Sequence, residues 1–101
     1  MIQNFRSYEL ALKFYRLCLR QRLVNPERGQ LRRASLSICN NLGEGWGRRT
    51  AADRGHFFDI AFGSLRESQT IIRATQLKDP ELVMTADQLG GSLYRLCYPR
   101  P

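Results

Sequence analysis

Helix-initiation signals divide this chain into four segments, and this division constrains the fold more than any other feature of the sequence. Asn-Pro-Glu (residues 25–27) and Asp-Pro-Glu (residues 79–81) each combine a capping residue, a proline suited to the first helical turn and an early acid. Thr50 and Asp53 have the spacing of a capping box. Between these breaks, apolar residues recur at helical spacing, and strand-like alternation never exceeds a few residues. The sequence therefore predicts four helices, over about residues 5–24, 26–46, 51–76 and 80–97.

The connections between these segments are short, so consecutive helices are expected to lie antiparallel. We therefore predict an all-α fold, an up-down-up-down antiparallel four-helix bundle. A chain of 101 residues suits a single domain over residues 1–101. It has neither a run of about 18 apolar residues nor an N-terminal signal pattern, so no membrane association is expected. Its three cysteines are an odd number and far apart, which indicates free, buried thiols in a reducing cytoplasm.

Positive charge is concentrated in the N-terminal half. Residues 1–49 contain ten Lys/Arg and three Asp/Glu, whereas residues 50–101 contain six of each. Fourteen of the sixteen basic residues are arginine, whose planar guanidinium pairs bidentately with phosphate or carboxylate. Two interpretations stay open at this point. One is a solvated surface that favours solubility, and the other is a surface for an anionic partner, with nucleic acid the first candidate.

The first predicted helix carries one basic stripe and two apolar stripes. The basic stripe and two later arginines are candidate nucleic-acid contacts: Arg6, Lys13, Arg16, Arg20, Arg32 and Arg49. Aromatic residues are sparse among these cations, so contact with the backbone is a stronger prediction than base stacking. The stripe predicted to face the core comprises Tyr8, Ala11, Leu12, Tyr15, Leu19 and Leu23.

The second apolar stripe of this helix consists of Leu10, Phe14 and Leu17. A helix of a monomeric bundle needs only one apolar face, so we predict that the second stripe forms an oligomer interface. The alternative is that these side chains cover adjoining helices or are exposed singly.

Two glutamates are expected to have cationic partners. Glu67 projects beside an apolar stripe of the third helix, where an unpaired carboxylate would be costly to desolvate. Glu44 lies in the glycine-rich end of the second helix. We predict that Arg33 and Arg48 form structural ion pairs with these acids and so link the second and third helices. Gly63 in the third helix is expected to allow close helix approach.

No residue pattern indicates catalysis, a cofactor or a metal. The glycine-rich run 43–47 lacks a preceding strand and the spacing of a nucleotide-binding loop, so we interpret it as a helix end where Gly47 can take the left-handed conformation. His56 is the only histidine and has no Cys or His at ligand spacing. We therefore expect a protein that is not an enzyme. A helix-lined site joining Glu44, Glu67 and His56 is the alternative.

Three stretches of the sequence resemble a known family. They are Gln-Leu-Arg-Arg-Ala-Ser-Leu-Ser-Ile (30–38), Asn-Leu-Gly-Glu-Gly-Trp-Gly-Arg-Arg-Thr (41–50) and Ile-Ala-Phe-Gly-Ser-Leu-Arg-Glu (60–67). Together they resemble the four-helix-bundle family of 23S rRNA intervening-sequence proteins, which is related to the accessory variability determinant proteins of diversity-generating retroelements. The resemblance covers about residues 5–97. One departure is Cys39, where the family often has a proline.

The resemblance implies an up-down bundle that assembles into a ring-like homopentamer without known enzymatic activity. It also implies association with nucleic acid and a reverse transcriptase for the retroelement members. Two functions therefore stay open for this chain. The first is a homo-oligomeric bundle that binds the backbone of RNA or DNA through its basic surface, with affinity that falls steeply with salt. The second is a scaffold for a protein partner, in which the arginines are structural ion-pair partners.

Overall fold

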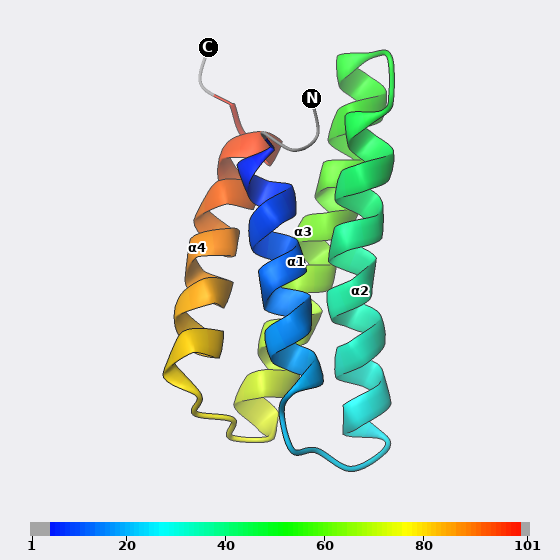
Figure 1. The fold of residues 1–101 in the computed structure, drawn as a ribbon. Helices are drawn as coiled ribbons and strands as arrows, with labels where there is room; N and C mark the ends of the chain where they lie inside the picture. The colour runs from blue at the N-terminus through cyan, green and yellow to red at the C-terminus, as the bar shows by residue number, and fades with distance from the viewer. Residues whose placement is uncertain (1–4, 100–101) are drawn as a thin grey trace.

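The structure is a computed structural model that describes residues 5–99, and within this range it contains four α-helices and no strand. The helices are α1 (Arg6–Leu19), α2 (Glu27–Trp46), α3 (Ala51–Ala74) and α4 (Pro80–Cys97). Figure 1 shows them side by side with roughly aligned axes, in a molecule that measures 40 × 22 × 22 Å. Both α1 and α3 pack against α2 and α4. The end formed by α2 and α3 projects beyond α1 and α4 (Figure 1).

Side-chain oxygens near the predicted helix starts satisfy backbone amides that have no partner inside the helix. Thr50 Oγ1 accepts a hydrogen bond from the N–H of Asp53 at 3.1 Å. Asp79 Oδ1 accepts from the N–H of Glu81 at 3.0 Å. At the start of α2, Asn25 Oδ1 accepts from a first-turn amide at 3.2 Å. These local contacts explain why α2, α3 and α4 begin within about one residue of the predicted positions.

Helix α1 is shorter than predicted, because it ends at Leu19 rather than near Val24. Gln21 Nε2 donates to the carbonyl oxygen of Leu17 and to Asp79 Oδ2, both at 3.0 Å. The first bond satisfies a carbonyl in the last turn of α1, and the second ties the end of α1 to the start of α4. The chain therefore leaves the helix here and crosses to α2.

The glycine-rich end of α2 serves close packing. Gly47 has a φ of −82°, so the prediction of a left-handed conformation there is wrong. Gly45 is buried, and a Cβ atom at this position would lie 2.8 Å from Phe58 Cε1 of α3. The absence of a side chain at Gly45 therefore lets α2 and α3 approach each other.

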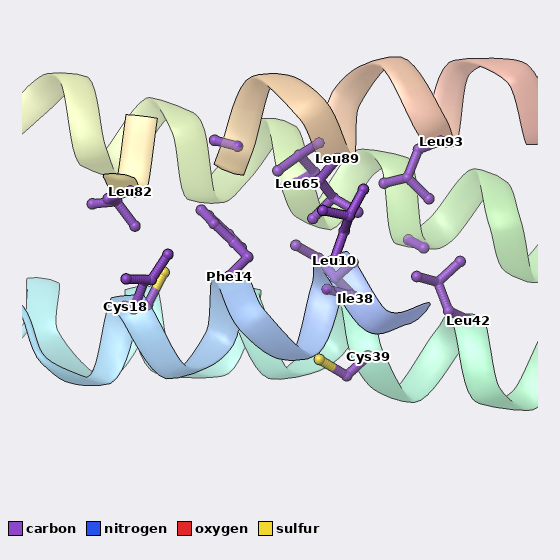
Figure 2. Packing of buried hydrophobic residues seen from close by; sticks show 14 of the residues in the cluster. Leu10, Phe14, Cys18, Ile38, Cys39, Leu42, Leu65, Leu82, Leu89 and Leu93 are labelled. Carbon is purple, nitrogen blue, oxygen red and sulfur yellow. The ribbon is translucent and has the colours of Figure 1, made fainter. Parts of the chain in front are cut away.

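All four helices contribute to the core (Figure 2). Figure 2 shows Leu10 and Phe14 pointing from α1 into the space that Leu65 of α3 and Leu89 of α4 also occupy. The larger apolar side chains that are fully buried are Phe14, Leu17, Leu31, Ile38, Leu42, Leu65, Leu82, Leu89 and Leu93.

The stripe of α1 that was predicted to form an oligomer interface lies in this core. Leu10, Phe14 and Leu17 are 9%, 0% and 1% exposed within a single chain. The prediction of an interface at these residues is therefore wrong, because side chains already buried in their own bundle offer no surface to another copy. These residues cover adjoining helices, which was the alternative.

The stripe predicted to face the core lies mostly at its edge. Leu19 is 51% exposed, and the side chains of Tyr8, Leu12 and Tyr15 are half-buried. Only Ala11 of the α1 positions in this stripe is fully buried. Tyrosine suits an edge position because its ring packs on apolar atoms while its hydroxyl reaches water.

Hydroxyl pairs join neighbouring helices inside the bundle. The Ser7 and Ser92 hydroxyls form a buried hydrogen bond between α1 and α4. Ser37 Oγ and Ser64 Oγ, 2.9 Å apart, join α2 to α3. Within residues 5–99, every buried side-chain nitrogen and oxygen has a hydrogen-bond partner. The core is therefore polar at a few matched positions and apolar elsewhere.

Candidate nucleic-acid interface

The six cations predicted to contact nucleic acid are all exposed, but the fold does not bring them together. Arg6 begins α1, and Arg49 lies in the α2–α3 turn, so both lie toward the end of the molecule that contains this turn (Figure 1). Arg20 follows the last residue of α1, and Arg32 lies in the second turn of α2, so both lie toward the opposite end. A single continuous stripe of six cations is therefore not formed.

Two of these cations, Lys13 of α1 and Arg20 directly after this helix, interact with acids at the start of α4. Lys13 Nζ lies 3.6 Å from Glu81 Oε2, with both side chains more than half exposed. The pKa of the Asp79 carboxyl is lowered, mainly by the hydrogen bond from Gln21 and to a smaller extent by the charge of Arg20. Water screens such surface pairs, so they contribute little stability. They do reduce the positive charge that Lys13 and Arg20 offer to an external anion.

A hollow of about 280 Å³ lies between the end of α1 and the start of α2. Arg28 and Arg32 line it from α2, together with Tyr15 of α1 and Gln21 and Asn25 of the connection. No carboxylate is among its lining residues. Its charged groups are therefore two guanidiniums, which are hydrogen-bond donors only.

Arg28 was not among the predicted contacts, although the sequence contained a signal for it. It precedes Arg32 by four residues, and residues with this spacing lie on the same side of a helix. The hollow itself depends on how α1 and α2 pack, which no local pattern reveals.

Arg16 extends this positive surface along α1. It is exposed and follows Tyr15, which lines the hollow, and its charge has a small lowering effect on the pKa of the Cys39 thiol in α2. We use the name α1–α2 basic face for Arg16, Arg28 and Arg32. Arg28 and Arg32 of this face line the hollow, and Arg16 belongs to the helix that forms the opposite wall.

The buried thiols beneath this face are not poised for reaction. Burial raises the pKa of the Cys18 thiol to about 12 and that of the Cys39 thiol to about 11. Both are free and buried as predicted, whereas Cys97 is only half-buried. A protonated thiol is a poor nucleophile, so neither buried cysteine supplies one near neutral pH.

The comparison with known families provides independent information about the chain. Residues 4–85 match the model of a family described as 23S rRNA-intervening sequence protein. The chain belongs to this family. A comparison with curated proteins gives no match. The resemblance seen in three sequence stretches is therefore confirmed at the level of the family.

One of the predicted ion pairs is present. Arg48 Nη2 lies 3.0 Å from Glu44 Oε2, and both side chains are partly exposed. The pair joins the last turn of α2 to the residues that follow it and does not bridge to α3. Arg48 reaches α3 in another way, because its guanidinium lies 4.7 Å from the centroid of the Phe57 ring.

The other predicted ion pair of this family member is absent from the part of the chain that the structure describes. Neither Arg33 nor Glu67 has an oppositely charged side chain within 4.0 Å among residues 5–99. The Glu67 side chain is exposed, so water solvates its carboxylate and no cation is required. The prediction that this pair links α2 to α3 is therefore wrong.

The turn between α2 and α3 uses a different arginine. Arg54 Nη1 donates to the carbonyl oxygens of Arg48 and Arg49, at 3.0 and 3.2 Å.

In residues 5–99, no group of three or more His, Cys, Asp or Glu side chains is arranged to hold a metal ion. Over the same residues, no helix is long and apolar enough to cross a membrane.

Proposed function

We propose that this protein is a non-enzymatic, antiparallel up-down bundle that binds the phosphate backbone of RNA or DNA through the α1–α2 basic face. The course of the chain in Figure 1 supports the antiparallel topology. The family description names an rRNA sequence, and the charge of the chain supports an anionic partner.

The observation that carries the proposal is the hollow between α1 and α2. Arg28 and Arg32 lie one helical turn apart on its wall, and no carboxylate lines it. Arginine presents several donors in a planar fork, which matches the oxygens of a phosphate group. A phosphate at this hollow would meet two guanidiniums, and Arg16 would contribute positive charge from α1.

The ion pairs present argue against the scaffold alternative. That function requires most arginines to be partners of structural acids. Within residues 5–99 the cations with a carboxylate inside 4.0 Å are Lys13 and Arg48. The three arginines of the α1–α2 basic face are not among them, so their charge is available to an external partner.

A pair of charge reversals tests the proposal. We expect Arg28→Glu with Arg32→Glu to abolish binding of a fluorescently labelled 20-base-pair duplex, measured by fluorescence anisotropy at 50 mM salt. The matched control is Arg49→Glu with Arg95→Glu, which reverses the same number of charges at exposed arginines that do not line the hollow. The control should retain most of the affinity. Equal losses in both proteins would show that only overall charge matters and would refute the proposed face.

We also propose that the protein forms a ring-like homo-oligomer, which the family resemblance implies to be a pentamer. We place it in the cytoplasm, where its free cysteines stay reduced. An interface must use exposed apolar side chains, of which Leu36, Ile60 and Met84 are examples on three helices. Light scattering should then give five times the chain mass of 11.7 kDa. A mass of one chain at every concentration would contradict assembly.

A further inference from the structure

A second positively charged surface lies on the helices that the α1–α2 basic face does not use. A groove of about 700 Å³ runs between α3 and α4, beside the connection that joins them. Three cations line it, Arg66, Arg73 and Lys78, together with a single acid, Asp87. Among residues 5–99, none of these cations has a carboxylate within 4.0 Å. The groove is therefore positive although residues 50–101 are neutral as a whole.

The groove is elongated along α3. Its α3 wall extends from Arg66 to Arg73, which is about 10 Å at the helical rise of 1.5 Å per residue. Gln76 to Lys78 of the connection between α3 and α4 lengthen the groove beyond the helix. Apolar side chains, including Ile72 and Val83, lie between the charged ones. An extended chain with regularly spaced negative charges fits this shape better than a single small anion does.

Aromatic rings continue this surface along the same two helices. The Arg66 guanidinium lies 4.7 Å from the centroid of the Phe62 ring, and the Phe62 ring meets Tyr94 edge-on at 6.5 Å. Tyr94 in turn lies 4.8 Å from Tyr98, between ring centroids. Tyr94 and Tyr98 are 56% and 60% exposed, so much of their surface is open to a ligand. Arg66 belongs to both the groove and this cluster, which makes the two continuous.

We propose that this α3–α4 surface binds a single strand of nucleic acid, with bases stacked on Tyr94 and Tyr98 and phosphates held by Arg66, Arg73 and Lys78. The inference rests on the proposed function, and it adds a preference for unpaired strands. Exposed aromatic rings beside a cationic groove are the arrangement by which proteins hold single strands without reading their sequence.

The rings determine which nucleic acid this surface prefers. In a duplex each base is already stacked on its neighbours, so only phosphates are available to the α3–α4 surface. An unpaired strand offers base faces as well, and each stacked base adds to its affinity. An acidic protein segment would engage the cations alone and gain nothing specific from the two tyrosines.

The test compares a labelled 20-nucleotide oligouridine with a 20-base-pair duplex in the same anisotropy assay. Tyr94→Leu with Tyr98→Leu removes the rings at exposed positions and keeps apolar side chains there. We expect affinity for oligouridine to fall about tenfold, with an unchanged salt slope and unchanged duplex affinity.

Arg73→Glu with Lys78→Glu should weaken oligouridine binding and lower the magnitude of its salt slope by about 1.4, because two phosphate contacts are lost. Unchanged thermal midpoints establish that each variant is folded.

Several outcomes would overturn the inference. The inference would be wrong if the tyrosine variants bound oligouridine as tightly as the original protein. The proposed function would still hold in that case if Arg28→Glu/Arg32→Glu abolished duplex binding. Polyglutamate that displaces oligouridine as well per charge as unlabelled strand does would favour an acidic protein segment. Photo-cross-linking of an oligouridine that contains 5-iodouridine locates the bound strand directly. We expect adducts at Tyr94 or Tyr98. Adducts confined to α1 and α2 would refute the site. If the protein binds neither probe, both proposals fail together.

Discussion

Gly45 and Gly63 occupy helices in two motifs of the family, but a side chain would meet different surroundings at each. A Cβ atom on Gly45 would lie 2.8 Å from the Phe58 ring, whereas one on Gly63 would have no neighbour within 4 Å. The expectation that Gly63 allows close helix approach is therefore wrong within a single chain. Only Gly45 is required by the packing of the bundle.

This difference predicts opposite effects of the same substitution. Gly45→Ala should destabilise the protein by about 1–2 kcal/mol, since the overpacking at Phe58 outweighs the gain in helix propensity. Gly63→Ala should stabilise it by up to about 1 kcal/mol, because only the propensity changes. Urea unfolding followed by circular dichroism measures both. Shifts of the same sign would contradict the account of Gly45.

The buried thiols predict how stability responds to alkaline pH. Burial raises the pKa values of Cys18 and Cys39 from 9.0 to about 12 and about 11, so the folded state favours the neutral thiols. Their contribution to stability is then complete below pH 9 and is lost as the pH rises from 9 toward 12, because the unfolded thiols ionise first. The thermal midpoint should therefore fall above pH 9 more steeply in the original protein than in Cys18→Ala/Cys39→Ala. Parallel pH profiles would show that other groups cause the decline.

At the scale of elements, the helix starts were predictable and the orientation of α1 was not. Capping side chains such as Thr50 and Asp79 act within a few residues, so the sequence records them directly. The buried face of α1 depends on its packing between α2 and α4. Small residues such as Ala11 and Cys18 belong to that face, and periodicity alone could not choose between two apolar stripes. The end of α1 could not be predicted either, because Gln21 donates a hydrogen bond to Asp79, which directly precedes α4 and is far from α1 in sequence.

The serine pair between α1 and α4 allows a test of how these helices are joined. Ser7→Ala leaves the buried Ser92 hydroxyl without its partner, which should cost about 1–3 kcal/mol. The double variant Ser7→Ala/Ser92→Ala removes both polar groups and should be less destabilised than the sum of the single variants. Unfolding free energies of the four proteins give the coupling. Strict additivity would mean that the hydroxyls do not stabilise each other.

At the scale of the whole molecule, the excess of charge was visible in the sequence and its distribution was not. Glu81 at the start of α4 offsets part of the positive potential around Lys13, although the two residues are far apart in sequence. Arg28 is a candidate phosphate contact only because α1 and α2 enclose a hollow beside it. The positive charge of the α3–α4 groove could not be seen in the sequence, because acids elsewhere in residues 50–101 bring the net charge of that half to zero. Each of these features depends on side chains brought together by the fold.

The salt dependence of duplex binding tests the central claim most directly. If Arg16, Arg28 and Arg32 each neutralise one phosphate, the logarithm of the association constant should fall with the logarithm of salt concentration at a slope of about −2.7. Between 50 and 200 mM salt, this slope corresponds to a loss of affinity of about 40-fold. Measured Kd values over this range should show it. No binding at 50 mM salt, or a slope near zero, would contradict the proposal that the α1–α2 basic face binds a phosphate backbone.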